Sequence, residues 1–187
     1  MTNGRLRPEG ARRWRIAVIN GPNMPNLGRR NREIYGPIRS LAELEELVAS
    51  FGELLGVDVV QFSSNHEGDI LDFIHRTASQ ADAFVINPAG LTAYGEATRH
   101  ALADTERPFV EVHFANIARH FDAIAPGGQR LESRFTYTAA GLVMGLRQHG
   151  YLGALLALCL SLDDPSFLGT SASPDQAATA ERGGLQS

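Results

Sequence analysis

The chain has 187 residues, of which 43% are hydrophobic and 20% are charged, and its formal net charge is -4. This composition predicts one globular domain, and no apolar run reaches the roughly 20 residues of a membrane span, so a cytoplasmic protein without a membrane partner is expected. All 17 basic residues are arginine, which excludes a lysine Schiff base and a lysine-containing P-loop.

The two ends of the chain differ in composition from its centre. Residues 1–14 combine proline, glycine and several arginines, which predicts a flexible, solvated extension. Nucleic-acid binding is not indicated, because the rest of the chain is acidic and has no basic helix face. Residues 164–187 are mostly small and polar, which predicts a disordered tail. One domain is therefore expected over residues 15–163.

Between these ends, short apolar runs rich in β-branched residues alternate with segments of helical periodicity. Ser40 and Glu43 form a capping-box pattern before the first long helix, and Ser64 and Glu67 form a second one before the next helix. This alternation predicts an α/β fold, a flavodoxin-like doubly wound five-stranded parallel sheet with helices on both faces. Strands are expected at about 15–20, 57–62, 83–87, 108–113 and 140–145, and helices at about 41–55, 64–78, 95–103 and 147–162.

The loops at the carboxyl ends of the strands are the expected place for chemistry, since ligands bind there in sheets of this kind. The loops after the first, third and fourth strands read "NGPNMPNLGRRNREIYG", "NPAGLTAYGE" and "EVHFANIARH". They contain asparagine, arginine, tyrosine, glutamate and histidine. No ligand set for a metal stands out, and no cofactor is expected.

Glu111 and His113 are two residues apart on the fourth expected strand, so their side chains project from the same face. A carboxylate in contact with an imidazole fixes its tautomer and favours its protonated form, which prepares His113 as a general acid. The alternative is a purely structural pair at a strand edge. The position at the carboxyl end of a central strand favours the catalytic interpretation.

Tyr35 lies five residues after Arg30 in the first of these loops. A phenol acts as a base only when it is ionised, and a nearby guanidinium stabilises the phenolate. The alternative is a solvated turn with a packed tyrosine, and this stretch alone leaves both open. Asn23 and Asn87 add neutral donors that suit a carboxylate or a developing enolate.

Together the three loops resemble the signature loops of the type II 3-dehydroquinate dehydratase family, in the same order and at nearly the same spacing. The resemblance runs from about Arg15 to Leu162. It implies the elimination of water from a small-molecule cyclohexanone carboxylate through an enolate, in a shikimate-type pathway that leads to aromatic amino acids. It also implies a homo-oligomer built from trimers, usually a dodecamer.

The resemblance further implies a role for each matching residue. Tyr35 matches the base that removes the proton next to the ketone, and Arg30 matches the arginine that favours its ionisation. Asn23 matches the asparagine that serves the enolate oxygen. His113 matches the general acid for the departing hydroxyl, with Glu111 as its orienting partner. The residues that match the family's substrate contacts are Asn87, Phe114, Ala115 and Arg130.

Two substrate-contact positions depart from the family pattern. Ala93 stands where the family has a histidine that contacts the distal ring hydroxyls, and His100 stands where it has an aspartate that reaches a neighbouring subunit's site. Three hypotheses follow: the dehydratase itself, a divergent lyase or cyclase that acts on a different specialised-metabolism carboxylate, and a non-catalytic binding homologue. Retention of the tyrosine-arginine and glutamate-histidine pairs counts against the last.

Overall fold

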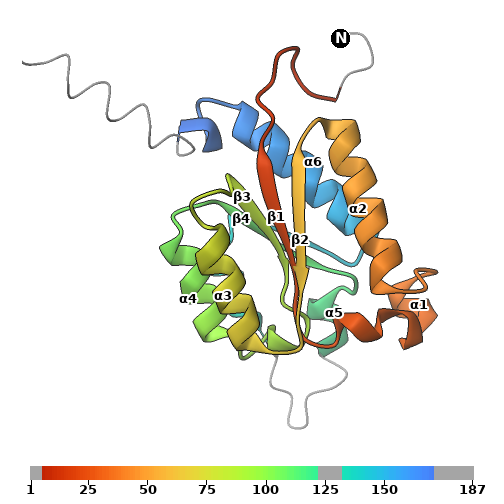
Figure 1. The fold of residues 1–187 in the computed structure, drawn as a ribbon. Helices are drawn as coiled ribbons and strands as arrows, with labels where there is room; N and C mark the ends of the chain where they lie inside the picture. The colour runs from red at the N-terminus through yellow and green to blue at the C-terminus, as the bar shows by residue number, and fades with distance from the viewer. Residues whose placement is uncertain (1–5, 122–131, 171–187) are drawn as a thin grey trace, which may run out of the picture.

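Five parallel strands form the centre of the computed structural model, which describes residues 6–121 and 132–170. Their order is β2-β1-β3-β4-β5, and helices cover both faces of the sheet (Figure 1). The order changes direction at β1, as it does in doubly wound sheets. The expected flavodoxin-like fold is therefore confirmed. The strands are β1 (Arg15–Asn20), β2 (Asp58–Ser63), β3 (Ala83–Asn87), β4 (Phe109–His113) and β5 (Gly141–Met144).

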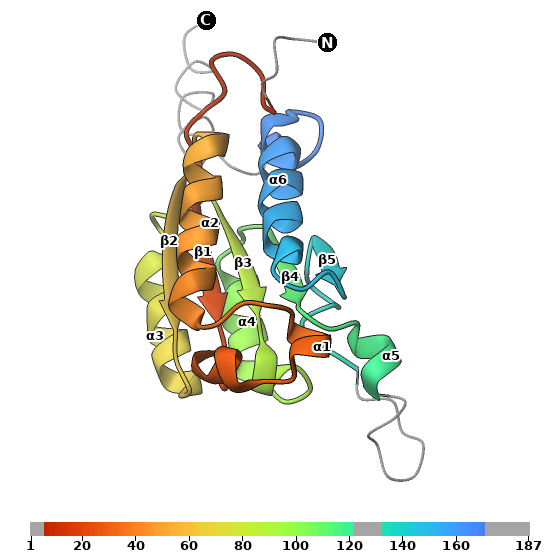
Figure 2. The same ribbon diagram turned by 90° about the vertical axis from the view of Figure 1, so that its right-hand side faces the viewer.

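Two pairs of long helices cover the sheet, with α2 and α6 on one face and α3 and α4 on the other (Figure 2). The loop after β1 contains two short helical segments, η1 and α1, where the sequence predicted only a loop. The α-helices are α1 (Arg32–Tyr35), α2 (Leu41–Leu55), α3 (Glu67–Thr77), α4 (Glu96–Asp104), α5 (Ile117–Phe121) and α6 (His149–Asp163), and the 3-10 helices are η1 (Met24–Arg29), η2 (Ala89–Leu91) and η3 (Leu168–Thr170). In the described ranges, no helix is long and apolar enough to cross a membrane.

Alternate residues of β1 supply two separate cores. Ile16 and Val18 pack toward α2 and α6, whereas Ala17 and Ile19 pack toward α3 and α4. All four are fully buried, which explains why the strand is a continuous apolar run. Cys159 of α6 lies in the first core as a small apolar side chain, and burial raises the pKa of its thiol to about 11.

The start of α2 follows the expected pattern in part. The Ser40 hydroxyl accepts a hydrogen bond from the Glu43 backbone N–H at 3.1 Å, as an N-cap does. The Glu43 carboxylate accepts from the backbone N–H of Arg39 at 2.7 Å rather than from that of Ser40. Gly56 ends the helix with a φ of 68°, in the left-handed region that glycine adopts without strain.

The start of α3 differs from the expected one. His66 is the N-cap residue, and its side chain makes no capping hydrogen bond. The Ser64 hydroxyl accepts from the backbone N–H of His66 at 2.9 Å and donates to Asp69 at 2.7 Å. The Glu67 carboxylate accepts from the Thr98 hydroxyl of α4 at 2.8 Å. The predicted second capping box is therefore wrong, because a tertiary contact between α3 and α4 engages its glutamate.

Residues 6–14, for which composition predicted a solvated extension, lie against the ends of α2 and α6. The Arg7 guanidinium is nearly buried, and it donates to Asp163 at 2.7 Å and to the Leu55 carbonyl at 2.9 Å. The Trp14 indole also donates to Asp163 at 2.7 Å, and Trp14 belongs to a core. Burial alone would raise the pKa of Asp163, but the hydrogen bonds from Arg7 and Trp14 lower it below its ordinary value.

Candidate active site

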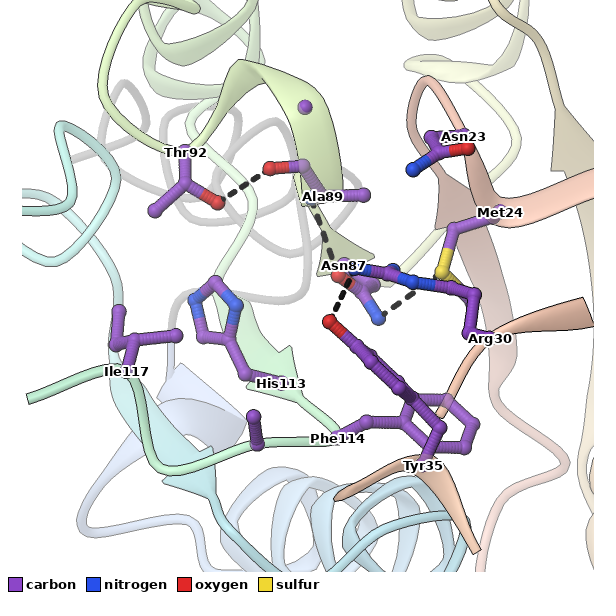
Figure 3. Close-up of a pocket in the computed structure, with 12 residues that line it drawn as sticks. Asn23, Met24, Arg30, Tyr35, Asn87, Ala89, Thr92, His113, Phe114 and Ile117 are labelled. Carbon is purple, nitrogen blue, oxygen red and sulfur yellow. Dashed lines mark hydrogen bonds between the residues drawn. The ribbon is translucent and has the colours of Figure 1, made fainter. Parts of the chain in front are cut away.

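A cavity of about 270 Å³ lies at the carboxyl ends of β1, β3 and β4, where the three quoted loops meet. Figure 3 shows that side chains from all three loops face this cavity. Most of the residues expected at the site line it, namely Asn23, Arg30, Tyr35, Asn87, His113, Phe114 and Ala115.

The loop after β1 supplies one wall through α1, which carries Tyr35 at its last position. The side chain of Asn31 begins this helix by accepting a hydrogen bond from the Glu33 backbone N–H at 2.8 Å. The Nη2 group of Arg30 donates to the Tyr35 hydroxyl, and the guanidinium carbon lies 3.7 Å from the centre of the Tyr35 ring. Partial burial lowers the pKa of Arg30, and the charge of an ionised Tyr35 opposes this shift. The Arg30 guanidinium is thus held against both the hydroxyl and the ring face of Tyr35.

The end of β4 supplies the opposite wall through His113. Its Nε2 atom lies 2.6 Å from Oε1 of Glu111, so the two side chains make the contact that their spacing predicted. Glu111 is fully buried behind the imidazole and does not line the cavity. In Figure 3 the imidazole and the Tyr35 hydroxyl face the cavity from different sides. One imidazole nitrogen is thus engaged by Glu111, and the other is left for a ligand.

Two hydroxyl groups complete the surroundings of Glu111. Ser133 donates to its Oε1 atom, and Thr136 donates to Oε2 at 2.5 Å. Burial alone would raise the pKa of Glu111, but the hydrogen bonds from His113, Ser133 and Thr136 outweigh it and lower the pKa. The sequence did not indicate these hydroxyls, because they lie 22 and 25 residues beyond Glu111.

Stability should depend on Glu111 at acid pH. Because its pKa is below the ordinary value of 4.5 in the folded chain, the ionised form stabilises the fold above about pH 4.5, and this contribution disappears as the pH falls through the folded-state value. The free energy of unfolding of wild type should exceed that of Glu111→Gln at neutral pH, with the difference shrinking on acidification. Denaturant titrations between about pH 3.5 and 7 measure this difference in the free energy of unfolding. The control is Glu46→Gln, because Glu46 is exposed on α2. A difference independent of pH would contradict the expectation.

Asn87 is held by a buried network behind the cavity. Its Nδ2 group donates to the Tyr151 hydroxyl at 2.9 Å, and its Oδ1 atom accepts from the Ala89 backbone N–H at 3.1 Å. The Tyr151 hydroxyl donates in turn to Oδ1 of Asn20 at 2.5 Å. Complete burial raises the pKa of Tyr151, so this side chain stays neutral. The network joins β1, β3 and α6 and fixes the orientation of the Asn87 amide.

Replacement of Tyr151 by phenylalanine should destabilise the fold. The change leaves Asn20 and Asn87 without their shared partner, and an unsatisfied buried polar group costs about 1–3 kcal/mol. For a chain of this size the melting temperature should fall by roughly 5 °C. Thermal unfolding measures the change, with Tyr94→Phe as the control, because the Tyr94 side chain is exposed. Equal melting temperatures for the two variants would argue against a stabilising network.

The remaining expected contact residues do not line this cavity. Ala93 lies beyond its rim, and its carbonyl accepts a long hydrogen bond of 3.4 Å from Arg134. His100 is on α4 with 60% of its side chain exposed, 3.7 Å from Glu96. Arg130 lies outside the described residues.

Sequence reasoning also missed some lining residues. Met24, Ala89, Thr92 and Ile117 contribute to the wall, and the Thr92 hydroxyl donates to the Ala89 carbonyl at 2.7 Å. These are ordinary core and turn residue types, so no motif distinguishes them. Over residues 6–121 and 132–170, no cluster of three or more histidine, cysteine, aspartate or glutamate side chains could hold a metal ion.

A cation-paired tyrosine and a carboxylate-paired histidine that face one cavity suit the removal of a proton at one point of a small molecule and its delivery at another. The fold and the site thus define an α/β protein with an acid-base site.

The chain belongs to the class II dehydroquinase family, whose model it matches over residues 14–159. It is 42% identical to a 3-dehydroquinate dehydratase of Halothermothrix orenii over 144 residues, which cover 77% of this chain and 93% of that protein. It is 40% identical to a 3-dehydroquinate dehydratase of Thermotoga maritima, with coverage of 75% and 92%. The crystal structure of a type II dehydroquinase from Propionibacterium acnes superimposes with a TM-score of 0.69 at 34% identity, with coverage of 78% and 95%.

Proposed function

We propose that the chain is a 3-dehydroquinate dehydratase, a hydro-lyase. The observation that carries the proposal is the placement of the Arg30-Tyr35 and Glu111-His113 pairs on separate walls of one cavity. Relatives named as 3-dehydroquinate dehydratases support the same substrate. The dehydratase is thereby favoured over a divergent lyase or cyclase and over a non-catalytic homologue.

Tyr35 acts first, as the base. Its phenolate oxygen takes the proton from the carbon next to the ketone, the carbon-hydrogen bond breaks, and the electron pair moves onto the ketone oxygen to form an enolate. Arg30, which touches both the hydroxyl and the ring of Tyr35, stabilises the phenolate before this step. Asn23 lies at the rim of the same cavity and supplies a neutral amide for the enolate oxygen.

His113 acts second, as the general acid. The enolate re-forms the ketone, the adjacent carbon-oxygen bond breaks, and the departing hydroxyl takes a proton from the imidazole nitrogen that Glu111 does not engage. Water and a conjugated enone result. The Glu111 carboxylate holds the other nitrogen at 2.6 Å, so it orients the ring for the transfer.

The substrate carboxylate is held at the wall formed by Asn87, Phe114 and Ala115. One Asn87 N–H is committed to Tyr151, and the only acceptor that faces the other N–H within the described part of the chain is the sulfur of Met24 at 3.5 Å. Sulfur is a weak acceptor, so a carboxylate oxygen is the better partner for this N–H. The backbone of Phe114 and Ala115 completes this contact, and Arg30 adds positive charge.

The test is direct. Purified protein is mixed with 3-dehydroquinate, and the ultraviolet absorbance of the conjugated enone is followed. Wild type should produce this absorbance, whereas Tyr35→Phe at the same concentration should not. If wild type produces no more than the variant, the proposal is wrong.

We also propose that the protein is a cytoplasmic homo-oligomer built from trimers, with a dodecamer as the expected assembly. Exposed apolar side chains near β5 support an interface there, since β5 is an edge strand and Tyr137, Leu142 and Leu146 are exposed on or beside it. Sedimentation of the purified protein tests the assembly, and a monomer would contradict it.

A further inference from the structure

The segment that leads into α6 touches the helix that carries Tyr35. Arg147 donates from its Nη2 group to the Glu33 carbonyl at 2.6 Å, across 114 residues of sequence. Its side chain also lies along Gly36, where an added Cβ would stand 2.8 Å from the Arg147 Cδ atom. Because Gly36 has no side chain, the Arg147 side chain can pass the end of α1 without a clash. Figure 2 shows α1 beside the start of α6.

Arg147 is also tied to the cavity wall. Its backbone N–H donates to the Phe114 carbonyl at 3.0 Å. Phe114 lines the cavity, and the centre of its ring lies 6.2 Å from that of Tyr35. The backbone of Arg147 is thus bonded to Phe114 in one wall of the cavity, and its side chain is bonded to α1, which carries Tyr35 in another wall.

Three features indicate that this contact matters to α1. A helix of four residues has almost no stability of its own. Among the described residues, the bond from Arg147 is the only hydrogen bond that joins α1 to a residue beyond the loop after β1. Arg147 also has a φ of 54°, a left-handed conformation that is unfavourable for any residue with a Cβ atom. Backbone stability alone would favour glycine there, so the contact of the side chain with α1 explains the arginine.

We propose that Arg147 is a positioning residue, which holds α1 and therefore Tyr35 over the cavity. Its effect on catalysis rests on the proposed function, whereas its effect on the order of α1 does not. Loss of the guanidinium frees the end of α1, and Tyr35 then spends less time against Arg30 and the substrate.

The decisive variant is Arg147→Gly, compared with Glu106→Gly. Glu106 has a φ of 55° and lies on the exposed turn before β4, away from the cavity, so it is a matched control for the backbone. Both changes remove a Cβ from a left-handed residue, and neither should lower the melting temperature. Hydrogen exchange of the α1 amides should accelerate about fivefold in Arg147→Gly only, as expected for the loss of one hydrogen bond.

A second measurement follows dehydration of 3-dehydroquinate. We expect kcat/KM to fall about fivefold in Arg147→Gly, to stay at the wild-type value in Glu106→Gly, and to recover largely in Arg147→Lys, which restores a positively charged donor. The same exchange and the same kcat/KM in both glycine variants would overturn the proposal. Faster exchange with unchanged kcat/KM would overturn the positioning of Tyr35. If wild type lacks dehydratase activity, the proposed function fails, and hydrogen exchange alone then decides whether Arg147 holds α1.

Discussion

Replacement of Tyr35 by phenylalanine is expected to lower kcat about a thousandfold, because general-base catalysis by a positioned side chain contributes roughly 10²- to 10⁴-fold. The change removes one oxygen atom and keeps the ring that packs near Phe114. Tyr35 is only half-buried, so the fold should survive. Steady-state kinetics with 3-dehydroquinate measure the effect, and thermal unfolding confirms that the variant is folded.

Tyr94→Phe is the matched control for this experiment. Tyr94 has 75% of its surface exposed and does not line the cavity, so its replacement should leave kcat unchanged. A Tyr35→Phe enzyme that retains a tenth or more of the wild-type kcat would exclude Tyr35 as the base.

Replacement of His113 by asparagine is expected to lower the rate of water elimination about a thousandfold, since it removes the general acid. Asparagine keeps a polar group near Glu111, whose hydrogen bonds to Ser133 and Thr136 are retained. The buried carboxylate therefore keeps two donors, and the variant should fold. Enone formation measures the loss.

Isotope exchange separates the role of His113 from that of Tyr35. In deuterated water, His113→Asn should still replace the hydrogen next to the ketone with deuterium, because Tyr35 and Arg30 are intact. Tyr35→Phe should lose both this exchange and elimination. Proton and deuterium contents of recovered 3-dehydroquinate are read by nuclear magnetic resonance. Loss of exchange in His113→Asn, with elimination equally reduced, would contradict the division between base and acid.

The parallel sheet and the position of its site follow from local patterns. Apolar β-branched runs such as Arg15–Asn20 make buried strands, and Ser40 caps a helix through a hydrogen bond to a residue three positions away. Glu111 and His113 meet because alternate residues of a strand share a face. Each of these contacts depends only on backbone geometry over a few residues, so the sequence alone predicts it.

The hydrogen bonds between residues far apart in the sequence could be identified only in the tertiary structure. Composition predicts that Arg7 is solvated, yet it is buried against Asp163. Glu67 fits a local cap, yet a neighbouring helix offers Thr98. Hydrogen bonds of this kind form between residues that only packing brings together, and no local periodicity encodes which of several polar groups will be nearest.

The same division holds at the site. By itself the sequence determined the fold class, the edge of the sheet where the cavity lies, and the contact between Glu111 and His113. Only the tertiary structure decided that Ser133 and Thr136 bond to Glu111 and that Arg147 reaches α1. The physical reason is distance along the chain, because a contact across 114 residues depends on how β5, α6 and the first loop pack.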